Sequence, residues 1–135
     1  MVNMSDEQLV AAFEAGQVPD GGFHHQQHVR VAWYYVRHHP LGEALTRFSE
    51  ALKRFAIAQG TPDLYHETIT TAYVLLISER VSDTEAGGWP AFAAANADLL
   101  QWKPSVLERY YTPETLWSAR ARTTFVMPDR MTNRP

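Results

Sequence analysis

The segments Phe23-His24-His25-Gln26-Gln27-His28-Val29-Arg30-Val31-Ala32-Trp33 and Tyr65-His66-Glu67-Thr68 decide both the predicted fold and the predicted site. They hold four of the six histidines in the chain. On a 3.6-residue helical period, His25 lies on the apolar stripe of the first segment and His28 lies along the edge of that stripe. If both segments are helical and pack together, imidazoles from two helices meet inside a bundle.

Histidines spaced in this way predict a metal site. His25 and His28 are three residues apart, so both rings face one side of a helix, and His66 supplies a third nitrogen from another helix. His24, paired with His28, is the second choice for the first ligand. Because the chain has no cysteine, the ligands must be nitrogen and oxygen. Imidazole suits one divalent ion of Zn, Cu, Fe or Ni, and Mn is kept as a fifth option.

Three further residues complete the predicted site. Glu67 is expected as a fourth ligand or as the general base of catalysis, although a carboxylate in the first turn of a helix is also favoured by the helix dipole. Arg122 is expected to hold a substrate carboxylate through two hydrogen bonds, with an ordinary surface arginine as the alternative. Tyr73 belongs to an aromatic set that forms core, part of which is expected to line a substrate pocket.

The pattern of apolar residues, caps and breakers predicts an all-α, single-domain bundle over residues 1–135. Main helices are expected between Ser5 and Gly16 and over residues 23–38, 41–59 and 62–80. Shorter helices should follow from Trp89, Lys103 and Thr112. Residues 82–88 are expected in a loop, and the apolar tail at 121–129 is expected to fold back over the bundle.

Composition limits the class of partner. The chain has 135 residues, is 45% hydrophobic and 20% charged, and carries a formal net charge of -3 with a pI near 6.0. These values give no electrostatic case for binding nucleic acid or an anionic membrane. The N-terminus does not read as a signal peptide, and the longest apolar window, around 73–77, is too short to cross a bilayer. We therefore expect a cytoplasmic protein with a small-molecule substrate, and leave a homodimer open.

These observations predict a metal-dependent enzyme that acts on a small polar or carboxylated molecule. Lewis-acid chemistry, as in a hydrolase or lyase, is favoured over oxygen chemistry at Fe or Cu, because three neutral ligands leave the ion able to acidify a bound water. The alternative is a non-catalytic helical module that binds a ligand or a protein, in which the histidines serve packing or pH sensing.

The pairing of FHHQQHVRVAW at 23–33 with YHETIT at 65–70 resembles a family of small helical bacterial proteins. The resemblance runs along roughly the whole chain. It implies that the two histidine segments belong together, and it carries no reaction, cofactor or site residue.

Overall fold

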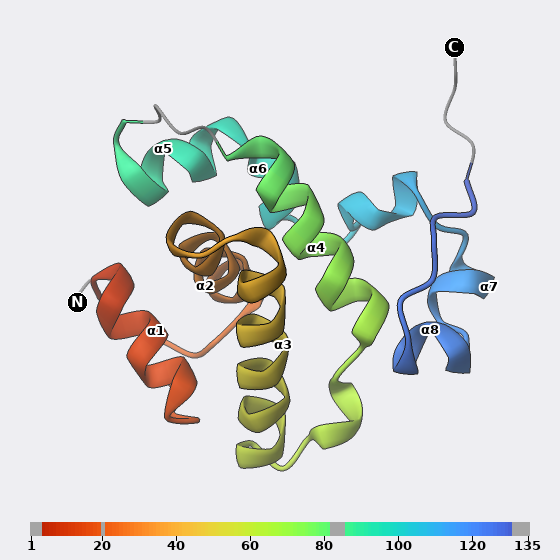
Figure 1. The fold of residues 1–135 in the computed structure, drawn as a ribbon, viewed down its shortest axis with the longest axis horizontal. Helices are drawn as coiled ribbons and strands as arrows, with labels where there is room; N and C mark the ends of the chain where they lie inside the picture. The colour runs from red at the N-terminus through yellow and green to blue at the C-terminus, as the bar shows by residue number, and fades with distance from the viewer. Residues whose placement is uncertain (1–3, 20, 82–85, 131–135) are drawn as a thin grey trace.

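Four helices form the main body of the protein in the computed structural model, which describes residues 4–19, 21–81 and 86–130 (Figure 1). They are α1 (Asp6–Glu14), α2 (His25–His38), α3 (Leu41–Ala58) and α4 (Glu67–Arg80). Helix α2 packs against the other three, and α3 also contacts α1 and α4. The described residues contain no β-strand, so the predicted all-α fold is confirmed.

The first and third helices start and end where the sequence predicts. At the start of α1 the backbone N–H of Gln8 donates to the Ser5 hydroxyl (3.1 Å), and the Gln8 side chain accepts from the Ser5 N–H (2.9 Å). This pair is the predicted capping box. Gly16 follows α1 and Gly60 follows α3, both with positive φ, which a residue without Cβ adopts at little cost.

Helix α2 begins two residues later than predicted, at His25 instead of Phe23. His24 precedes the helix in an extended conformation, and its N–H donates to the side-chain oxygen of Gln27 (2.8 Å). The His24 ring lies against the loop, with Nε2 3.1 Å from the carbonyl oxygen of Gly21. The alternative pair of His24 with His28 required His24 to lie within the helix, and His24 instead precedes it.

The predicted continuous helix over 62–80 is wrong in its first turn. A short 3-10 helix, η1 (Pro62–Leu64), comes first, and α4 starts only at Glu67. His66 stands between them with extended backbone (φ -137°, ψ 112°), and its ring Nδ1 accepts the N–H of Ile69 (3.1 Å). A histidine side chain thus caps the start of α4.

Helix α4 is central and is buried on most sides. One side packs on α2 and α3, and another contacts α8 (Ala119–Thr123). Thr68 is fully buried on the side of the C-terminal segment, where its hydroxyl donates to the carbonyl of Thr124 (2.8 Å) and accepts the N–H of Val126 (3.1 Å). The C-terminal segment therefore folds back over the bundle, as predicted.

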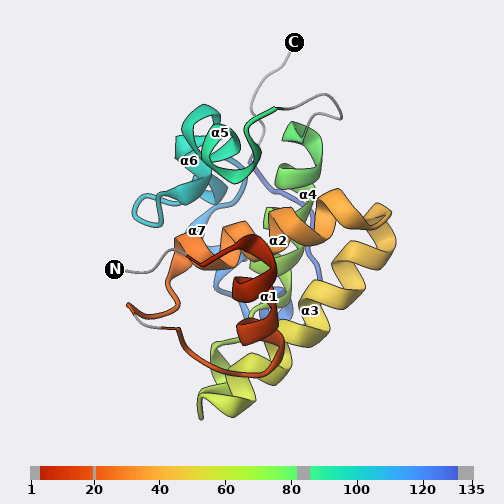
Figure 2. The same ribbon diagram turned by 90° about the vertical axis from the view of Figure 1, so that its left-hand side faces the viewer.

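Short helices follow α4 in the C-terminal part of the chain. Figures 1 and 2 both show α5 (Gly88–Ala95) and α6 (Ala97–Leu100) at the end of the molecule where α4 finishes. Arg80 of α4 forms an ion pair with Asp98 of α6 (2.6 Å). The helix predicted from Trp89 to Leu100 is interrupted at Asn96, and the one predicted from Lys103 is a 3-10 turn. The 3-10 turn is η2 (Val106–Arg109), and α7 (Pro113–Leu116) follows it.

Residues 82–85, predicted to lie in a loop, are outside the described part of the chain. Within the described residues, no helix has both the length and the apolar character needed to span a membrane.

Candidate functional site

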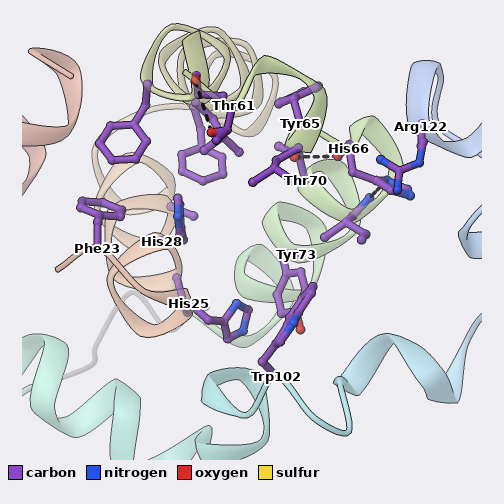
Figure 3. A pocket seen from close by; sticks show the side chains of 18 of the residues that line it. Phe23, His25, His28, Thr61, Tyr65, His66, Thr70, Tyr73, Trp102 and Arg122 are labelled. Atoms are coloured by element: carbon purple, nitrogen blue, oxygen red, sulfur yellow. Dashed lines mark hydrogen bonds between the residues drawn. The ribbon is translucent and has the colours of Figure 1, made fainter. Parts of the chain in front are cut away.

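A cavity of about 630 Å³ lies between α2, α3 and α4, and residues of the segment before α4 and of the C-terminal part of the chain complete its lining (Figure 3). This volume is within the range of sites that enclose a small organic molecule, roughly 300–1,000 Å³. Most of the wall is aromatic or aliphatic. The lining residues are Phe23, His25, His28, Val29, Ala32, Phe48, Leu52, Phe55, Ala56, Thr61, Leu64, Tyr65, His66, Ile69, Thr70, Tyr73, Trp102, Trp117 and Arg122.

The amphipathic pattern of α2 and α3 creates this wall. Residues of α3 at i, i+4 and i+7 (Phe48, Leu52 and Phe55) share the face that meets α2. Phe48 and Phe55 belong to the buried core and Leu52 is partly buried against it, so this face of α3 contributes to both the core and the cavity wall.

His25 lies in the first turn of α2 and has one ring nitrogen engaged. Its Nε2 is 2.9 Å from the carbonyl oxygen of Leu99 and therefore donates to it, which leaves Nδ1 as an acceptor. The ring contacts those of Tyr73 and Trp102, with centroids 5.0 Å apart in both cases. Burial lowers the pKa of His25, and the bond to Leu99 opposes this in part. His25 is therefore neutral at pH 7.

His28 lies one turn further along α2 among phenylalanine rings. Its ring meets Phe23 edge-on at a centroid distance of 4.7 Å, and Phe13 and Phe55 at 6.1 Å. Burial lowers the pKa of His28 to about 4, with smaller contributions from His25 and His24. Neither ring nitrogen of His28 has a hydrogen-bond partner among the residues that the structure describes.

His66 is buried, and both of its ring nitrogens are engaged. Nδ1 accepts the N–H of Ile69, so Nε2 carries the proton and donates to the carbonyl of Leu116 (2.7 Å). Burial is the main cause of the lowered pKa of His66, and the nearby cation of Arg122 also lowers it. In this arrangement His66 has no lone pair free to bind a metal ion.

The three histidines predicted as metal ligands thus line one cavity without converging. Within residues 4–19, 21–81 and 86–130, no three His, Asp or Glu side chains are placed to share a metal ion. The physical reason is the competition of backbone groups: Leu99 binds the ring of His25, and Ile69 and Leu116 bind that of His66. The three-histidine metal site, with Zn, Cu, Fe, Ni or Mn, stays a prediction.

Glu67, predicted as ligand or general base, is not among the lining residues of the cavity. Its carboxylate accepts the hydroxyl of Tyr65 (2.7 Å), and the burial of Tyr65 together with this bond raises the pKa of the phenol. Tyr65, which donates this bond, lines the cavity, whereas Glu67 does not.

Tyr73 and Arg122, predicted to bind substrate, both line the cavity. The hydroxyl of Tyr73 is already bonded to that of Ser105 (2.9 Å), so Tyr73 presents mainly its ring. The guanidinium of Arg122 lies 5.6 Å from the centre of the Trp117 ring, and one of its N–H groups reaches the carbonyl of Asp63 at 3.5 Å. Arg122 has no carboxylate partner in the described part of the chain.

The mouth of the cavity carries exposed apolar side chains. Leu64, Trp102 and Trp117 line the cavity and are 73%, 38% and 49% exposed. Figure 3 shows Trp102 below Tyr73, and Arg122 beside His66 on the side of the cavity away from His28. Since the lowered pKa values keep the three histidines neutral, Arg122 is the one full charge in the described lining at pH 7.

A comparison of this chain with protein-family models, with curated proteins and with solved structures finds no match. The resemblance to small helical bacterial proteins therefore stays a prediction.

Proposed function

We propose that the protein binds a small, largely apolar carboxylate in the cavity between α2, α3 and α4. The supporting observation is an apolar cavity of about 630 Å³ with a single full charge in its described lining, the guanidinium of Arg122. Burial of an apolar body supplies most of the affinity in such sites, and a few polar groups fix the orientation of the ligand.

The chemistry of Arg122 selects a carboxylate. A guanidinium presents parallel N–H donors that match the two oxygens of a carboxylate, and charge-assisted bonds of this kind are about twice as strong as neutral ones. Stacking on Trp117 holds the guanidinium at the mouth, and its contact with Asp63 is a long one, at 3.5 Å to a neutral carbonyl. The cation is therefore available to an anionic group of the ligand.

Titration with decanoate and with decan-1-ol tests this proposal, because the two molecules share an apolar chain and differ in charge. Calorimetry and tryptophan fluorescence follow binding, since Trp102 and Trp117 line the cavity. We expect decanoate to bind about tenfold more tightly than decan-1-ol, a difference of about 1.4 kcal/mol. Arg122→Gln should remove this preference and leave the affinity for decan-1-ol unchanged.

Arg120→Gln is the matched control, because Arg120 is an exposed arginine of the same helix, α8, and does not line the cavity. This variant should bind decanoate as the wild type does. The proposal is contradicted if decanoate does not bind, or if Arg120→Gln and Arg122→Gln weaken decanoate equally.

We propose the metal-dependent enzyme as a second candidate, favoured by one observation. His25 and His28 line the same cavity, both are neutral, and the ring of His28 has no hydrogen-bond partner in the described chain. A third bond from His66 requires its ring to release Ile69 and Leu116. Stoichiometric Zn, Cu, Fe, Ni or Mn in the purified protein, lost in His28→Ala, would support this candidate, and a metal content unchanged by that substitution would contradict it.

A further inference from the structure

The ring of His28 is a polar group on an otherwise aromatic part of the cavity wall. Phe13, Phe23 and Phe55 surround it, with the nearest ring centre 4.7 Å away. His28 is half-buried, and its ring nitrogens are not among the fully buried side-chain atoms that lack a hydrogen-bond partner in the described residues, so they stay open to a partner from outside the chain. Within the described residues, the protein supplies no such partner to His28. Because His28 lines the cavity, a ligand bound there can supply the partner.

His28 and Arg122 lie on opposite sides of the cavity. Figure 3 shows His28 beside Phe23 on the wall formed by α2, and Arg122 with His66 across the open space. A ligand whose carboxylate pairs with Arg122 therefore extends its apolar body toward His28. The wall between them is formed largely by side chains that offer no charge, such as those of Phe55 and Ile69.

The surroundings of His28 decide which kind of group it pairs with. A neutral imidazole offers one donor and one acceptor, and which nitrogen carries the proton is not fixed here by any bond to the described protein. A hydroxyl both donates and accepts, so it pairs with either form of the ring. A second charge at this end would be enclosed by phenylalanine rings without an opposite charge, which is costly.

We infer that the ligand is a hydroxycarboxylate with its hydroxyl remote from its carboxylate, and that His28 selects it by a hydrogen bond to that hydroxyl. This inference rests on the proposed function, because Arg122 sets the direction in which the ligand lies. His28 is then the residue that distinguishes a hydroxyl-bearing ligand from a plain carboxylate of the same length.

A chain-length series tests the inference. Alkanoates from hexanoate to hexadecanoate, and the matching ω-hydroxyalkanoates, are titrated into the full-length protein. At the length that spans from Arg122 to His28, we expect the hydroxyl to tighten binding about three- to tenfold, as for one net hydrogen bond. At shorter lengths the hydroxyl should weaken binding, because it is buried against apolar side chains.

His28→Phe should abolish the gain at every length, and His28→Leu serves as a second apolar replacement should the first fail to fold. His24→Phe is the matched control and should keep the gain, because the His24 ring lies at Gly21 and does not line the cavity. The inference is overturned if no length shows a gain, or if the gain persists in His28→Phe or His28→Leu. In both cases binding of the plain alkanoates would leave the proposed function intact. If neither series binds, the proposed function itself fails.

Discussion

His28 and His66 lie on the wall of one cavity, and their ring nitrogens are used in opposite ways. Both nitrogens of His66 bind backbone groups, one at the start of α4 and one at Leu116. The nitrogens of His28 have no partner in the described chain, and phenylalanine rings surround it. The ring of His66 therefore serves the fold, whereas we propose that the ring of His28 serves the ligand.

The largest expected effect is the loss of stability when His66 is replaced. His66→Ala removes the cap of α4 and leaves the N–H of Ile69 and the carbonyl of Leu116 without partners. We expect the free energy of unfolding to fall by about 2–4 kcal/mol in urea denaturation. His66→Asn should recover part of this loss, since asparagine is a good N-cap residue.

The corresponding substitution of the second histidine is His28→Phe. It should change the free energy of unfolding by less than about 1 kcal/mol, since no hydrogen bond to the described protein is lost. Equal losses in His66→Ala and His28→Phe would contradict the contrast between the two histidines.

The second effect concerns the pH dependence of stability. The pKa of His28 is about 4 in the folded protein and near its ordinary value of 6.5 when unfolded, so the unfolded chain binds more protons between these values. The free energy of unfolding therefore keeps its full value above pH 6.5, as far as His28 is concerned, and falls as the pH drops from 6.5 toward 4. With one pKa unit equal to about 1.4 kcal/mol, and allowing for partial contact with solvent, this loss is about 1–3 kcal/mol.

Urea denaturation of the wild type and of His28→Phe at several pH values measures this effect. The wild type should lose more stability than the variant between pH 6.5 and pH 4, while above pH 7 the two profiles should run parallel. Profiles that are parallel over the whole range would show that His28 is not held neutral by burial.

The smallest expected effect is at Glu67, next to His66. Glu67→Gln keeps an acceptor for the Tyr65 hydroxyl, so we expect a stability change below about 1 kcal/mol. The affinity for decanoate should stay within about twofold of the wild type, because Glu67 does not line the cavity. A tenfold or greater loss of affinity, seen by calorimetry, would instead place Glu67 in the binding site.

The parts of the fold that follow from local chemistry could be predicted from the sequence. The capping box of Ser5 and Gln8 starts α1 as expected, and the apolar period of α3 gives its length to within one residue. The prediction of one helix over 62–80 failed because the ring of His66 competes for the Ile69 N–H and restarts the helix there. Propensity rules favour serine, threonine, asparagine and aspartate as caps and do not anticipate this histidine.

The residues that line the candidate site could be predicted from the sequence better than their hydrogen bonds. Helical spacing predicted that His25, His28 and His66 face the interior as metal ligands; all three line the cavity, although His66 does so as the residue before α4 and their role as ligands stays a prediction. The sequence could not show that the ring of His66 binds Leu116, 50 positions away, or that the ring of His25 binds Leu99, 74 positions away. Those bonds depend on how the C-terminal elements dock, which no local pattern encodes.

Long-range nitrogen–proton NMR of the histidine rings tests the central contrast most directly. At pH 7, spectra are recorded before and after addition of the ω-hydroxyalkanoate that binds most tightly. We predict that His66 shows a neutral ring protonated at Nε2 in both spectra, while the ring signals of neutral His28 shift on binding. Signals of His66 that respond to the ligand, with those of His28 unchanged, would contradict the account.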